Sequence, residues 1–120
     1  MKNFRDLKVW TKAHQLALNI YNVSKSFPKE EQFGITSQIR RAALSIPTNI
    51  AEGCGRGSDS DFARFIQIAF GSASEVEYQI FFCRELHFIQ ENIYSTLSND
   101  VIEIKKSLTA LLKKLRADSR

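Results

Sequence analysis

The chain has 120 residues, of which 43% are hydrophobic and 25% charged, with a net charge of +4. One domain of this size buries a sufficient core without metals or disulfides, so this composition excludes a disordered chain and a disulfide-stapled miniprotein. The N-terminal sequence lacks the apolar core of a signal peptide, and no segment approaches the roughly 18 apolar residues of a membrane span. We therefore expect one cytoplasmic domain, residues 1–120, without membrane contact.

Helical periodicity begins near the N-terminus and predicts a first helix from about Asp6 to Ser26. Its main face is expected to carry Trp10, Ala13, Ala17, Ile20, Tyr21 and Ser24, with Val9, Leu16 and Val23 in a second line beside it. This helix should end at Phe27, because the residue before a proline avoids the α region and Pro28 follows.

A second helix is predicted from about Gly34 to Cys54. Its buried residues should be Ile35, Ile39, Ala42, Ala43, Ile46 and Ile50. Pro47 lies inside it, removes the hydrogen bond to the Ala43 carbonyl and costs roughly 3 kcal/mol in an ordinary helix, which predicts a bend. Asn49 is expected close to the buried face, where its amide could supply the missing donor, and Glu52 at the border of that face.

A glycine-rich turn then leads into two long helices. Ser58 and Asp61 have the spacing of an N-cap pair, which predicts a third helix from about Asp59 to His87. Its main stripe is Phe62, Phe65, Ile66, Ala69, Ala73, Val76, Ile80 and Cys83. The fourth helix, about Asn92 to Ala117, carries Leu97, Val101, Ile104, Leu108, Leu111 and Leu115 in an a/d pattern. The short loops favour an all-α, up-down-up-down antiparallel four-helix bundle.

Several segments carry a resemblance to a known family. They are residues 27–42, the run Ser45-Ile46-Pro47-Thr48-Asn49-Ile50-Ala51-Glu52-Gly53, then Phe62-Ala63-Arg64-Phe65 and Gly71-Ser72-Ala73-Ser74-Glu75. The chain thereby resembles, from Leu7 to about Leu115, the four-helix-bundle proteins encoded in intervening sequences of bacterial 23S rRNA genes. This S23 ribosomal protein-like family includes accessory proteins of diversity-generating retroelements. The resemblance implies a homopentameric, barrel-like assembly and no catalytic activity.

The third helix has more apolar surface than a single core requires. At about 100° per residue, Ile68, Phe82 and Leu86 lie on the side away from its main stripe, with the small residue Gly71 nearby. We expect them to form the subunit interface of a homo-oligomeric ring. The alternative is a wide core that absorbs Phe81 and Phe88, with Leu86 packed under the following turn.

Positive charge is concentrated at both ends of the sequence. Residues 1–29 hold six Lys/Arg and one acidic residue. Residues 30–100 hold five Lys/Arg and ten acidic residues, and residues 101–120 hold six Lys/Arg and two acidic residues. In an antiparallel bundle the two chain ends meet, together with the turn near residue 56. We therefore predict a basic pole made of Lys2, Arg5, Lys8, Lys12, Arg56, Arg64, Lys113, Lys114, Arg116 and Arg120. The opposite pole should collect Glu30, Glu31, Glu85 and Glu91.

Clustered Lys/Arg residues are typical of a surface that binds the nucleic-acid backbone, with affinity that falls steeply with salt. The alternative is a solvated face that only keeps the protein soluble. Trp10 is assigned to the core, so stacking on single-stranded bases is not expected.

Arg40 and Arg41 lie on either side of the buried stripe of the second helix, too far from the basic pole to join it. We expect one of them to pair with an acid such as Glu75 or Glu77, across a helix or subunit boundary. An RNA contact is the alternative.

No pattern of catalytic, metal-binding or cofactor-binding residues emerges. The histidines His14 and His87 lack the Glu-x-x-His spacing of a di-iron bundle. Cys54 and Cys83 have no metal-ligand spacing and are expected to be reduced, buried thiols. The glycines after the second helix lack the preceding strand and the Gly-Lys-Ser/Thr ending of a phosphate loop. We therefore expect a protein that is not an enzyme and has no cofactor.

Two functions follow from these observations. The first is a non-catalytic, oligomeric RNA-binding protein, with 23S rRNA as a candidate ligand, that contacts phosphates through the basic pole. The alternative is a protein–protein scaffold or accessory subunit for an RNA-processing partner, a reverse transcriptase or a ribosomal component.

Overall fold

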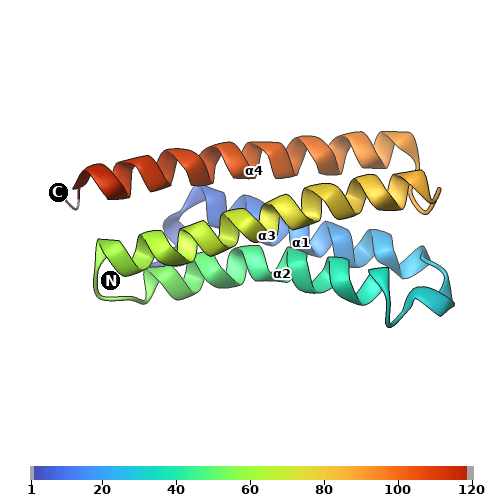
Figure 1. The fold of residues 1–120 in the computed structure, drawn as a ribbon, viewed down its shortest axis with the longest axis horizontal. Helices are drawn as coiled ribbons and strands as arrows, with labels where there is room; N and C mark the ends of the chain where they lie inside the picture. Colours follow the sequence, from blue (N-terminus) through green and yellow to red (C-terminus); the bar gives the residue numbers. More distant parts are fainter. Residues whose placement is uncertain (1, 119–120) are drawn as a thin grey trace.

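The computed structural model describes residues 2–118 and consists of four packed helices within that range (Figure 1). They are α1 (Lys8–Val23), α2 (Ile35–Cys54), α3 (Asp59–Glu85) and α4 (Glu91–Asp118), with no strand among the described residues. Successive helices run in opposite directions, and α1 completes the bundle by packing against α4. The predicted antiparallel four-helix bundle is confirmed.

The first helix is shorter than predicted because its two ends are separate 3-10 helices. These are η1 (Phe4–Asp6) before α1 and η2 (Ser24–Ser26) after it, and a third, η3 (Lys29–Glu31), precedes α2. Leu7 is extended, with φ −89° and ψ 122°, and divides η1 from α1. Phe27 is also extended, at φ −67° and ψ 153°, as the following proline requires.

The core is a continuous apolar cluster drawn from all four helices. Its α1 face is centred on Val9, Leu16 and Ile20, so Tyr21 lies at the edge and is 40% exposed. The prediction that Tyr21 belongs to the core is therefore wrong. In α4, Leu112 is buried where the a/d pattern predicted Leu111, which is only partly buried. Both residues flank the apolar stripe at about 100° per residue, and neighbouring helices decide which one is covered.

The ends of α3 have identifiable stop and start signals. Ser58 Oγ accepts a hydrogen bond from the Asp61 backbone N–H at 3.1 Å, as the N-cap spacing predicted. At the other end, His87 has a φ of 62°. The His87 N–H donates to the Arg84 carbonyl and the Phe88 N–H to the Cys83 carbonyl, both at 2.9 Å. This is a Schellman ending, and it stops α3 two residues before the predicted position.

Pro47 is buried inside α2, which nevertheless runs as one helix from Ile35 to Cys54. The prediction that Asn49 donates to the Ala43 carbonyl is wrong. Its amide donates instead to the Ser45 carbonyl at 2.8 Å and to Ser45 Oγ at 2.9 Å. Ser45 Oγ also lies 2.8 Å from Ser72 Oγ of α3. Asn49 therefore belongs to a polar link between α2 and α3. Its amide donates to the Ser45 carbonyl because that acceptor, one turn back, is nearer than the Ala43 carbonyl.

Candidate nucleic-acid interface

Basic residues from distant parts of the sequence meet at one end of the bundle. Figure 1 shows the N-terminal segment, the turn between α2 and α3 and the last turns of α4 at the same end. The Lys2 backbone N–H donates to the Cys54 carbonyl at 3.1 Å, which ties the N-terminal segment to this turn. We call this surface the basic end. Its described members are Lys2, Arg5, Lys8, Arg56, Arg64, Lys113, Lys114 and Arg116, all of them exposed. Arg120 lies outside the described residues.

Lys12 differs from the other predicted members of the basic pole. Its ammonium group lies 3.1 Å from a carboxylate oxygen of Glu103, in the middle of α4. This pair neutralises Lys12 and links α1 to α4. Within residues 2–118, no ion pair joins Lys2, Arg5, Lys8, Lys113 or Lys114 to an acid.

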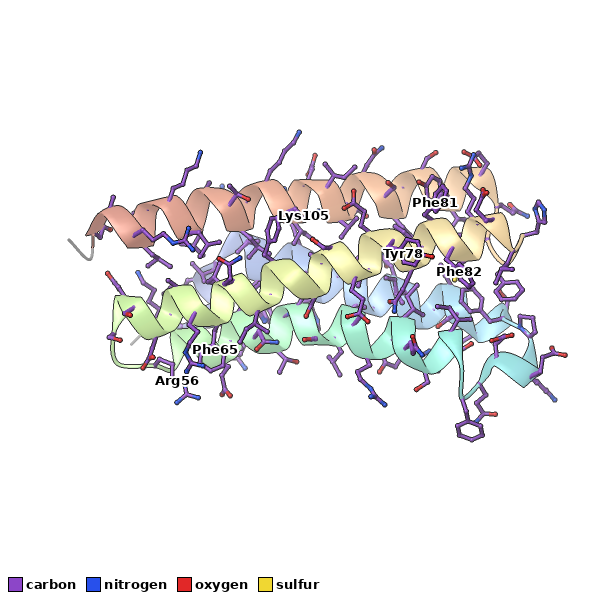
Figure 2. All side chains as sticks on the ribbon, in the orientation of Figure 1. Arg56, Phe65, Tyr78, Phe81, Phe82 and Lys105 are labelled. Atoms are coloured by element: carbon purple, nitrogen blue, oxygen red, sulfur yellow. The ribbon has the colours of Figure 1, made fainter. Side chains whose placement is uncertain are left out.

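Arg56 and Arg64 are held by the ring of Phe65. Their guanidinium carbons lie 4.7 and 4.8 Å from its centroid, and Figure 2 shows Arg56 beside Phe65 at this end of the molecule. Each also has a long ion pair, Arg56 with Glu52 at 3.7 Å and Arg64 with Asp61 at 3.8 Å. Exposed pairs of this length contribute little stability. The ring therefore positions two guanidinium groups that solvent and ligands can still reach.

The opposite end of the bundle is less acidic than predicted. Arg84 lies there and pairs with Glu91 at 2.7 Å and with Glu85 at 3.7 Å. Lys25 and Lys29, which the sequence places in the basic N-terminal quarter, also lie at this end, in η2 and η3. The two ends therefore differ in charge mainly because cations gather at the basic end, and less because acids gather at the opposite end.

Arg40 makes structural contacts, but its partners within the described residues are not the predicted acids. Its guanidinium donates to Ser24 Oγ at 2.7 Å and to the Tyr21 carbonyl at 3.2 Å, and it lies 4.9 Å from the Tyr21 ring centroid. Arg40 thus caps the C-terminal end of α1, where a cation is favoured. The expected pairing with an acid is wrong for Arg40 within this chain, because Glu77 binds Lys105 and Glu75 accepts from Gln79. Arg41 is exposed on α2.

The outer side of α3 exposes large apolar side chains. Ile68 is 43% exposed, Phe82 39% and Leu86 42%, and no atom lies within 4 Å of a Cβ built on Gly71. Tyr78, which the sequence analysis did not include, extends this row and is 62% exposed. Figure 2 shows Tyr78 and Phe82 on one side of α3 and Phe81 on the side facing α4. We call Ile68, Gly71, Tyr78, Phe82 and Leu86 the exposed α3 face.

Both cysteines are buried, as predicted, and neither forms a disulfide. Within the described residues, no group of three or more potential metal-ligating side chains is present. None of the helices in residues 2–118 combines the length and the apolar content that a membrane crossing requires.

Comparison with known proteins gives two positive results. A family model described as the 23S rRNA-intervening sequence protein matches residues 5–110. A crystal structure of a protein of unknown function from the S23 ribosomal protein family of Bacteroides thetaiotaomicron is 32% identical in sequence, with a TM-score of 0.81. The match covers 88% of this chain and 95% of that chain. Among proteins with curated descriptions, none matches the sequence.

Proposed function

The chain belongs to the 23S rRNA-intervening sequence protein family, and from this premise we propose that it is a non-catalytic, oligomeric RNA-binding protein. The observation that carries the proposal is the convergence of exposed cations from the N-terminal segment, the α2–α3 turn and the end of α4. Such a cluster attracts the phosphate backbone and contributes affinity with little sequence preference. The name of the family makes 23S rRNA the first ligand to examine.

The proposal is tested by reversing two charges at the basic end. Lys113→Glu/Lys114→Glu should weaken binding of a structured 23S rRNA fragment and lower the slope of log K against log salt by about one per lysine removed. The matched control is Lys25→Glu/Lys29→Glu, which makes the same change in net charge at the opposite end of the bundle. Equal losses for both double variants would contradict a localised phosphate-binding surface.

We also propose that the protein assembles through the exposed α3 face into a homo-oligomeric ring, for which the family resemblance suggests a pentamer. An exposed row of large apolar residues on one helix supports this assignment, because monomeric proteins seldom leave such a row in water. A ring of subunits would repeat the basic end several times and increase its avidity for a long polyanion.

The same apolar row supports a second candidate function, a scaffold for a protein partner such as a reverse transcriptase or a ribosomal component. A scaffold of this kind would keep its partner when the charges at Lys113 and Lys114 are reversed, whereas the RNA-binding function would be lost. Pull-down of a candidate partner with the double variant therefore separates the two functions.

A further inference from the structure

A groove of about 460 Å³ lies between the N-terminal segment, α1 and α2. Its volume is within the range of small-molecule binding sites, which is about 300–1,000 Å³. The residues that matter for its chemistry are Phe4, Trp10, His14, Leu44, Pro47 and Glu52. We call it the aromatic groove.

Three aromatic side chains form a continuous wall of this groove. The ring centroids of Phe4 and Trp10 are 4.7 Å apart, and those of Trp10 and His14 are 4.9 Å apart with planes only 6° from parallel. Trp10 is only partly buried, in contrast to its predicted place in the core, and His14 is exposed. Both extend toward α2 because the buried face of α1 is centred on Val9 and Leu16. Trp10 contacts Phe4 and is stacked on His14, so the exposed ring of His14 is where another flat ring could extend the stack.

The charges around the groove favour a neutral ligand inside it and phosphates beside it. Glu52 is the acid that lines the groove, and its carboxylate would repel a phosphate while accepting hydrogen bonds from N–H groups. Two cations contact the walls from outside. The Arg5 guanidinium lies 4.4 Å from the Phe4 ring centroid, and that of Arg56 lies 3.7 Å from Glu52. The groove is thus continuous with the basic end.

We propose that the aromatic groove binds an unpaired nucleobase of the RNA whose phosphates the basic end holds. An unpaired base stacks on aromatic side chains irrespective of its identity, and its ring edge presents N–H donors to the Glu52 carboxylate. This inference rests on the proposed RNA-binding function and adds a preference to it. RNA with a bulged or looped-out nucleotide should bind better than the same duplex without one.

The test compares two RNA duplexes that differ only by a single unpaired nucleotide. The wild-type protein should bind the bulged duplex at least about fivefold more tightly, which corresponds to the lower limit for stacking one base. Leu44→Glu adds a charge to the groove wall and should abolish this preference while duplex binding remains. Leu18→Glu is the matched control, because Leu18 and Leu44 are both leucines of 50% exposure and Leu18 does not line the groove. His14→Ala, at an exposed position, should reduce the preference without disturbing the core.

Three results would overturn the inference. Equal affinity of the wild-type protein for the two duplexes would show that the groove takes no base, while the proposed RNA-binding function would stand. A preference that persists in both Leu44→Glu and His14→Ala would assign it to another surface. Absence of binding to either duplex would refute the RNA-binding function and the inference together.

Discussion

The two thiols are shielded from solution, and their protonation follows from that burial. Burial raises the pKa of Cys83 to about 11, and Glu31 adds to the effect. Burial also raises the pKa of Cys54, although Lys2 opposes it. Because the thiolate is the reactive form, both thiols of the native protein should react slowly with dithionitrobenzoate at pH 8. For Cys83 the rate should be on the order of 100-fold below that in the urea-unfolded chain.

The same shift gives a pH dependence of stability. Above pH 9 the unfolded chain loses the Cys83 proton while the folded chain keeps it until about pH 11. The free energy of unfolding should therefore decline across this interval, and Cys83→Ser should remove that part of the decline. Rapid reaction of either thiol of the native protein with dithionitrobenzoate at pH 8 would contradict the burial on which both predictions rest.

Single-residue roles were the least predictable part of the chain. Burial of the apolar residues followed from helical spacing, since most of the expected core is enclosed. The partners of long polar side chains did not follow, because a guanidinium can reach several acceptors and the sequence does not rank them. Arg40 illustrates this, since it binds the end of α1 through Ser24 and the Tyr21 carbonyl instead of a carboxylate.

At the scale of the helices, the end of α3 gives a clear prediction for stability. His87 occupies the left-handed region at φ 62°, where an L-residue is strained and glycine is not. His87→Gly should therefore raise the free energy of unfolding by about 0.5–1 kcal/mol. His14→Gly, inside α1, should lower it by about 1 kcal/mol, because glycine is unfavourable in a helix interior. Urea denaturation followed by circular dichroism measures both, and a destabilised His87→Gly protein would contradict this ending of the helix.

The close approach of α2 to α3 depends on Gly53. A Cβ built there would lie 2.8 Å from Phe62 Cδ1 and 3.0 Å from Phe65 Cβ. Gly53→Ala should therefore destabilise the protein by about 1–3 kcal/mol in thermal unfolding, in spite of the better helix propensity of alanine. Gly57→Ala is the control, because a Cβ there meets no atom within 4 Å. A neutral or stabilising Gly53→Ala would mean that the two helices are not packed this closely.

The helices themselves were predictable and their ends less so. Periodicity placed all four, and the Ser58 cap fixed the start of α3, whereas α1 ends at Val23, before the predicted stop at Phe27–Pro28. The 3-10 helices around α1 and the ending of α3 at Glu85 have weaker signals. They depend on the conformations of Leu7 and His87, which are set by the packing of the adjoining segments.

At the scale of the whole molecule, the exposed α3 face determines the expected assembly. Phe82→Glu places a charge in that row, and burying an unpaired charge at an interface is costly. We expect this variant to be monomeric in size-exclusion chromatography with light scattering, whereas the wild-type protein should elute as the proposed ring. The matched control is Phe33→Glu, because Phe33 is 90% exposed in the segment before α2 and is not part of the exposed α3 face. A monomeric wild-type protein, or an unchanged assembly of Phe82→Glu, would contradict the interface.

The candidate RNA surface was predictable in outline because the antiparallel topology brings the chain ends together. Its details depended on side-chain contacts that cross between elements. Lys12 is taken out of the surface by Glu103, and Phe65 orders Arg56 and Arg64. The aromatic groove was missed, because the spacing of Trp10 places it at the margin of the buried face, where the sequence does not distinguish core from surface.

The position of Trp10 has a practical consequence. It is the single tryptophan of the chain, and its indole ring lies against Phe4 and His14. Indole emission depends on local polarity and on contact with neighbouring rings, and selective excitation at long ultraviolet wavelengths leaves the three tyrosines silent. The protein therefore carries its own fluorophore at the groove, and occupancy there can be followed optically in unlabelled material.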